Sequence, residues 1–85
     1  MDKTIRLIVL SSGKTLISEV EEFTPSELGD PDWKLIKPYE IDESDIRPWL
    51  ESETDQTVFK IISDTIFTVA DPKKELLEKY LEKNN

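Results

Sequence analysis

The sequence predicts a mainly β fold: a five-stranded, strongly bent antiparallel small barrel with a C-terminal α-helix. Short runs of β-branched and aromatic residues recur along the chain, and residues that favour turns separate them. The clearest pattern with helical spacing lies near the C-terminus. Because 85 residues provide for one small core, we expect residues 1–85 to form a single domain.

The first two strands are expected at about residues 4–11 and 14–23, joined as a hairpin. Gly13 lies in the polar break between them and readily adopts the positive φ that a tight reversal requires. The first run is apolar on both faces apart from Arg6, which is typical of a strand covered on both sides. Apolar and polar residues alternate more clearly in the second run.

The third strand is expected at about residues 33–41, after a loop rich in turn-forming residues. Pro38 has no amide hydrogen to donate to a ladder, so this strand should lie at an edge or bend at that point. Residues 42–57 are the most acidic part of the chain and are interpreted as an irregular excursion between strands. Apolar side chains are available to hold this excursion against the body, namely Ile46, Trp49 and Leu50.

The last two strands are expected at about residues 57–62 and 65–70, with a tight connection between them. Asp71 and Pro72 then form a start signal, with aspartate as the N-cap and proline at the first helical position. The helix is expected at about residues 72–83. Its apolar stripe must pack on another part of the protein and consists of Leu76, Leu77, Tyr80 and Leu81.

The composition argues against several classes of function. The chain has 19 acidic and 11 basic residues, and its net charge of −8 is opposite to that of a general nucleic-acid binder. Histidine and cysteine are absent, so the usual zinc ligands and the usual general base are missing. We therefore expect no metal, no cofactor and no enzymatic activity. No apolar run approaches the ~20 residues that cross a bilayer, and the N-terminus lacks a signal peptide, so we expect a cytoplasmic protein that does not bind membranes.

Two segments resemble the Sm/LSm-like family. The predicted hairpin has the spacing L-x-x-G-x-x-L-x-G-x-L-x-x-F at Leu10, Gly13, Leu16, Val20 and Phe23, with Ser18 in place of the second glycine. Residues 61–69 align without gaps with the motif I-R-G-D-N-V-V-x-I. The resemblance implies an Sm-like small barrel that forms a ring, binds single-stranded RNA or DNA and acts in RNA or DNA processing. A compact acidic variant of this kind would suit a bacteriophage, which would place the protein in the host cytoplasm.

The residues with which the family binds RNA are replaced in this chain. Thr24 and Leu28 stand at the positions of the aspartate and asparagine after the second strand, and Ile62 and Ser63 stand at those of the arginine and glycine. By loop position alone, nucleic-acid contacts are expected at Lys14, Thr24, Ile62, Ser63 and Thr65. Stacking on exposed aromatic side chains could add to them, although the candidates Trp33, Tyr39 and Trp49 are interpreted first as core or loop anchors.

The last two predicted strands are the expected sites of self-association. In the resembling fold they are the edges of the sheet, and here they are apolar, so they invite pairing with another chain. We expect a cyclic homo-oligomer of about five to seven subunits joined head to tail. The expected interface comprises Val58, Phe59, Lys60, Ile61, Ile62, Ile66, Phe67, Thr68 and Val69. The alternative function is a protein-interaction or assembly module on the same scaffold, with an acidic surface for a basic partner.

Overall fold

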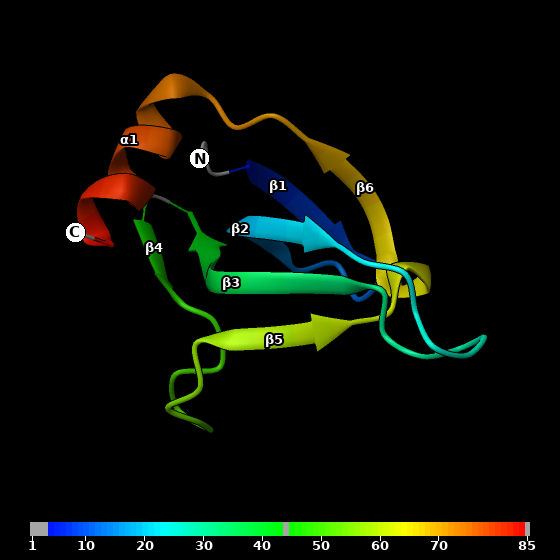
Figure 1. Ribbon diagram of the computed structural model, residues 1–85. Helices are drawn as coiled ribbons and strands as arrows, with labels where there is room; N and C mark the ends of the chain where they lie inside the picture. The colour runs from blue at the N-terminus through cyan, green and yellow to red at the C-terminus, as the bar shows by residue number, and fades with distance from the viewer. Residues whose placement is uncertain (1–3, 44, 85) are drawn as a thin grey trace.

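One antiparallel sheet curls around an apolar interior, and a single helix packs against its outer face (Figure 1). The computed structural model describes residues 4–43 and 45–84. Its strands are β1 (Ile5–Leu10), β2 (Thr15–Glu22), β3 (Trp33–Asp42), β4 (Asp45–Pro48), β5 (Val58–Ile61) and β6 (Ile66–Ala70). A short 3-10 helix, η1 (Ser63–Thr65), joins β5 to β6, and the chain continues into the helix α1 (Lys74–Lys83). The predicted mainly β fold with a C-terminal helix is confirmed.

The strand order is β4-β3-β2-β1-β6, and β5 also pairs with β3. β3 is therefore an interior strand: β2 lies along one of its edges, while β5 and β4 share the other. β5 pairs with residues 33–36 of β3 and β4 pairs with residues 39–42. The break between these two partners falls at Lys37, which has a φ of 52°, and at Pro38. The predicted bend at the proline is thus present, but β3 is not an edge strand.

Residues 42–57 were expected to be irregular, but the structure has the short strand β4 within them. Its four residues form a hairpin with the end of β3, with Ile41 opposite Ile46 and Glu40 opposite Arg47. Burial of Ile46 in the core stabilises this short strand, and an Arg47–Glu40 ion pair of 3.2 Å bridges the two strands. Acidic residues around the turn mask the strand in the sequence, because only one of its four side chains is buried.

Two apolar clusters lie on opposite faces of the sheet. Inside the curl, the buried residues are Ile8, Leu16, Val20 and Leu35. Between the sheet and α1, they are Ile5, Ile17, Ile46 and Tyr80. The adjacent residues Leu16 and Ile17 are both fully buried because successive side chains of a strand point to opposite faces. This arrangement explains why β1 is apolar on both faces.

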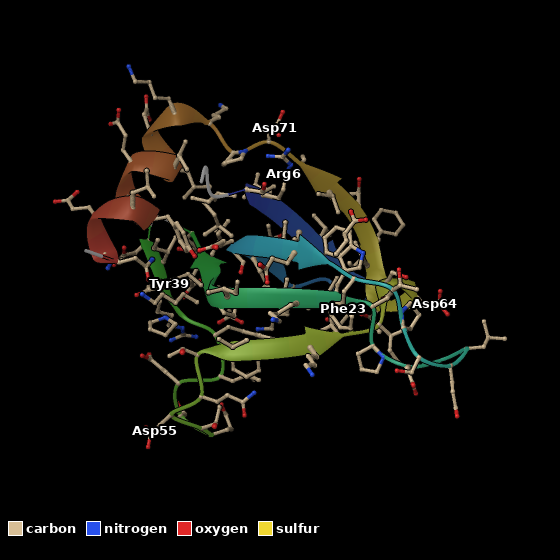
Figure 2. All side chains as sticks on the ribbon, viewed as in Figure 1. Arg6, Phe23, Tyr39, Asp55, Asp64 and Asp71 are labelled. Carbon is tan, nitrogen blue, oxygen red and sulfur yellow. The ribbon has the colours of Figure 1, made fainter. Side chains whose placement is uncertain are left out.

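The predicted start of the helix is wrong. α1 begins at Lys74, and residues 71–73 continue from β6 outside the helix. The N-cap residue is Lys73 and not Asp71. The Asp71 carboxylate lies 3.3 Å from the Arg6 guanidinium of β1 (Figure 2). The predicted stripe also loses one member, because Leu81 is 40% exposed. Leu76, Leu77 and Tyr80 do pack against the sheet, as expected.

A tyrosine hydroxyl group joins α1 to an irregularity in the sheet. The register between β2 and β3 shifts between Ile17 and Glu19, which disturbs the regular ladder of hydrogen bonds. The Tyr80 hydroxyl lies 2.8 Å from the carbonyl oxygen of Lys37 and accepts a 3.2 Å hydrogen bond from the amide of Glu19. It also lies 3.1 Å from the carbonyl oxygen of Ile36. The helix therefore supplies polar partners that the shifted ladder lacks.

No helix in the described part of the chain is long and apolar enough to cross a membrane.

Candidate binding groove at the strand turns

A groove of about 460 Å³ opens where the β1–β2 turn, the loop before β3 and η1 meet. We call it the turn groove. Its lining residues are Leu10, Ser11, Ser12, Pro31, Trp49, Lys60, Ile61, Ile62 and Thr65. They come from five separate stretches of the sequence, so the groove exists only once the sheet has folded.

Hydrogen bonds between the loops hold the turn groove open in one shape. The amide of Ser11 donates to the carbonyl of Thr65 at 2.8 Å, which ties the β1–β2 turn to η1. Asp32 accepts two bonds of 2.7 Å from Ser63, one from its amide and one from its hydroxyl. These bonds also hold the pKa of the Asp32 carboxyl below its usual value. The loop before β3 is thus fixed to η1 by a carboxylate that remains charged at neutral pH.

The walls of the turn groove are largely apolar. Leu10, Trp49 and Ile61 also pack against the inner cluster, so the groove is continuous with the interior of the curl. The Trp49 ring lies edge-on to Phe59 with 5.2 Å between the centroids, which fixes its position. The segment carrying Trp49 follows β4, and the amide of Trp49 donates to the carbonyl of Pro38 at 2.9 Å.

Three aspartates are next to lining residues of the turn groove in the sequence. Asp30 and Asp32 flank the lining residue Pro31, and Asp64 precedes the lining residue Thr65. We call these three residues the acidic rim. Lys60 is the cationic residue of the lining, but its Nζ lies 6.0 Å from the ring centroid of Phe23. Figure 2 shows Phe23 and Asp64 at the same end of the molecule.

The structure places the five predicted nucleic-acid contacts differently with respect to this groove. Ile62 and Thr65 line it, and Ser63 lies between them in the chain, bonded to Asp32. Thr24 is exposed in the loop after β2 and lies outside the lining. Lys14 is also outside, in the β1–β2 turn, where its Nζ lies 3.0 Å from Glu40.

Lys14 forms an ion pair with Glu40, which the sequence does not predict. The Glu40 carboxylate is only 14% exposed and is shared between Lys14 and Arg47. The hydrogen bond from Lys14 and the nearby Arg47 hold the pKa of the Glu40 carboxyl below its usual value. Lys14, predicted by loop position as a nucleic-acid contact, therefore has an ion-pair partner within the chain.

The sequence reasoning also missed Trp49 and Pro31 as groove residues. Trp49 was considered as a loop anchor or a stacking residue, and it both packs on Phe59 and lines the groove. By contrast, Trp33 packs against the inner cluster and Tyr39 packs edge-on against Tyr80, with 5.5 Å between the centroids. No local signal in the sequence identifies Pro31, because its role depends on the approach of η1.

β5 and β6 form the second candidate site. Within the described residues, β5 pairs with β3 alone and β6 pairs with β1 alone, so each leaves an outer edge unpaired. Phe67 of β6 is 77% exposed, and the rest of that strand beyond Ile66 is exposed as well. Of the nine expected interface residues, those exposed at the surface are Val58, Lys60, Phe67, Thr68 and Val69. The other four are half-buried within the chain and are Phe59, Ile61, Ile62 and Ile66.

The sequence profile of a family of unknown function, DUF6561, matches residues 3–85. The chain belongs to this family. No curated protein sequence matches it. Because the function of DUF6561 is unknown, membership assigns no activity, and the function of this DUF6561 domain is inferred from the turn groove and the strand edges. Across residues 4–43 and 45–84, its acidic side chains form no group suited to holding a metal ion.

Proposed function

We propose that this DUF6561 domain is an assembly module whose copies join through the outer edges of β5 and β6 and close into a ring. The observation that supports this most directly is the position of the two strands at opposite edges of one curled sheet, each with its outer edge unpaired. One edge of a subunit can then pair with the other edge of the next. A head-to-tail contact forms a closed ring when the rotation from one subunit to the next is a whole fraction of a full turn. The resemblance to Sm-like rings suggests about five to seven subunits.

The side chains of these edges favour association over exposure to water. Along β5 and β6, Lys60 is the only charged residue, and proline is absent from both strands. Natural edge strands that stay unpaired are usually protected by charged residues or proline. β5 and β6 have little of this protection. Phe67 adds a large apolar surface at the same edge strand, and burying a phenylalanine side chain contributes about 1.5–3 kcal/mol.

Sedimentation equilibrium tests the proposed ring. The expected mass is a multiple of the 9.9 kDa subunit, in the range of about five to seven copies, and it should not change on dilution over a tenfold range. A mass near 9.9 kDa at all concentrations would sink the proposal.

We also infer that the assembled domain binds a positively charged protein. Support comes from the net charge of −8 and from the acidic rim beside the turn groove. Complementary charge mainly accelerates association and selects among partners, so binding should weaken as salt is added. Binding of a basic polypeptide, with an acidic one as the control, tests this class of partner by calorimetry. Equal binding of the two polypeptides would contradict it.

Single-stranded RNA or DNA binding, with a role in RNA or DNA processing, stays a prediction. In its favour, Ile62 and Thr65 line a groove that also contains the Trp49 ring, on which a base could stack. The charges oppose it, since Lys14 is paired with Glu40 and the acidic rim would repel phosphates. Titration of labelled oligo-U and oligo-A at low salt tests it, and any binding should have a shallow salt dependence because few cations are present.

A further inference from the structure

We propose that the turn groove is the docking site for a short peptide segment that presents one apolar side chain flanked by arginine or lysine. This inference rests on the proposed basic partner, and it names where that partner binds and by what chemistry. The lining of the groove comes from a single copy of the chain, and three of its residues, Lys60, Ile61 and Ile62, are also among the residues expected at the ring interface.

The size and the walls of the groove suit an apolar side chain. Its volume of about 460 Å³ lies within the range of about 300–1,000 Å³ that is typical of binding pockets. Trp49 provides an aromatic wall, and Ile61 and Ile62 provide aliphatic ones. The hydroxyl groups of Ser11 and Ser12 lie at the β1–β2 turn, where they can bond the backbone of an extended peptide. The other polar residues of the lining are Lys60 and Thr65, and the remaining five are apolar.

The acidic rim favours positively charged residues on either side of the apolar side chain of the peptide. The three residues of the acidic rim are chain neighbours of the lining residues Pro31 and Thr65, and they outnumber the one lysine of the lining, Lys60. Asp32 is held in place by Ser63, so its charge is at a defined position. A guanidinium or ammonium group within roughly 8–10 Å of this rim is attracted at physiological salt, whereas a phosphate there is repelled. The same groove is thus better matched to a basic peptide than to nucleic acid.

The groove is also preformed, which lowers the cost of binding. The Ser11–Thr65 and Ser63–Asp32 hydrogen bonds fix the loops on both sides, and the Phe59 ring holds Trp49. Little loop ordering has to accompany binding, so more of the contact free energy appears as affinity.

The first test uses tryptophan fluorescence of the full chain. The protein has two tryptophans, and Trp33→Phe leaves Trp49 of the groove as the single reporter. The probe is a synthetic peptide with one leucine between two pairs of arginines. Saturable change in Trp49 fluorescence is expected, with affinity reduced about tenfold or more when serine replaces the leucine or glutamates replace the arginines. Equal affinity of the leucine and serine peptides would overturn the proposal, because binding would then depend on charge alone.

Matched variants assign the binding to the groove. Ile62→Asn removes an apolar wall and should weaken binding about tenfold, whereas Leu28→Asn changes a fully exposed loop residue outside the groove and should leave it unchanged. Asp64→Lys and Asp55→Lys change the net charge equally, but Figure 2 shows the two residues at different ends of the molecule. Asp64→Lys should weaken binding several times more than Asp55→Lys. Equal effects within either pair would contradict docking in this groove.

Other outcomes separate this inference from the proposed functions. A ring by sedimentation with no response of Trp49 to the peptide would overturn the groove while the ring stands. A monomer that binds the peptide would overturn the ring and support the groove. Displacement of the peptide by oligo-U at low salt, with tighter binding of the oligonucleotide, would overturn the peptide as ligand in favour of nucleic acid.

Discussion

At the scale of single residues, the Tyr80 hydroxyl joins α1 to the backbone of the sheet. It bonds the backbone at the point where the β2–β3 register shifts, and the residue is only 3% exposed. Ser18 is buried beside it, and its hydroxyl lies 2.8 Å from the carbonyl oxygen of Glu19 and 3.1 Å from that of Ile36. Two side-chain hydroxyl groups thus complete the hydrogen bonding of the irregular ladder.

Tyr80→Phe should destabilise the protein by about 1–3 kcal/mol, because it keeps the ring but leaves buried backbone groups without a partner. Urea denaturation of the wild type and the variant measures this loss. Tyr39→Phe, the same chemical change in the ring packed against Tyr80, is the control and should cost less. A Tyr80→Phe loss no larger than that of the control would contradict the role of the hydroxyl.

The same residue predicts how stability depends on alkaline pH. Burial raises the pKa of Tyr80 from 10.0 to about 12. The unfolded chain therefore releases this proton first as the pH rises, so the contribution of Tyr80 is complete below pH 10 and is lost between pH 10 and 12. The free energy of unfolding, measured across this window, should fall more steeply for the wild type than for Tyr80→Phe. Parallel curves would show that Tyr80 is not the group responsible.

At the scale of elements, α1 depends on the sheet for its stability. It is ten residues long and its N-cap residue, Lys73, makes no side-chain capping bond. Isolated helices shorter than about 12–15 residues are marginal in water, so packing of its apolar face must supply the stabilisation. Leu76 and Leu77 pack beside Tyr80 on the cluster that includes Ile46 of β4.

Leu77→Asp should cost several kcal/mol, since it places an unpaired charge against this cluster. Leu81→Asp is the matched control on the same helix, because Leu81 is 40% exposed and should tolerate the charge much better. Thermal unfolding followed by circular dichroism compares the two. If both variants melt at the temperature of the wild type, α1 is an appendage and the packing interpretation is wrong.

At the scale of the whole molecule, the curl of the sheet sets β5 along the bottom and β6 along the right of Figure 1, so the two unpaired edges lie on different sides of the molecule. Phe67→Lys should disrupt the proposed ring, because it introduces a charge at an exposed edge position without removing any core contact. A shift of the native mass toward the 9.9 kDa monomer, with the far-ultraviolet circular dichroism retained, is the expected result. Leu28→Lys adds the same charge at an exposed loop residue and should leave the mass unchanged. An unchanged mass for Phe67→Lys would show that β6 is not in the contact.

The sequence by itself determines most of the elements. Alternating apolar residues, Gly13 and the late helical stripe identify five of the six strands and α1, because these signals act between residues close in the chain. The last two strands, expected at the edges of the sheet, do lie there as β5 and β6. β4 was missed because a short strand with one buried side chain has almost no periodic signal.

Only the tertiary structure decided which distant side chains meet. Trp49, Pro31 and Ile62 line one groove, and Lys14 is paired with Glu40, although nothing local in the sequence relates these residues. The neighbours of Asp71 in the sequence predict an N-cap, yet its carboxylate lies beside Arg6 near the other end of the chain. The reason is physical. Local sequence patterns report backbone preference and the spacing of apolar residues, which depend on residues close in the chain. Grooves and ion pairs depend on how the curled sheet brings separate strands together.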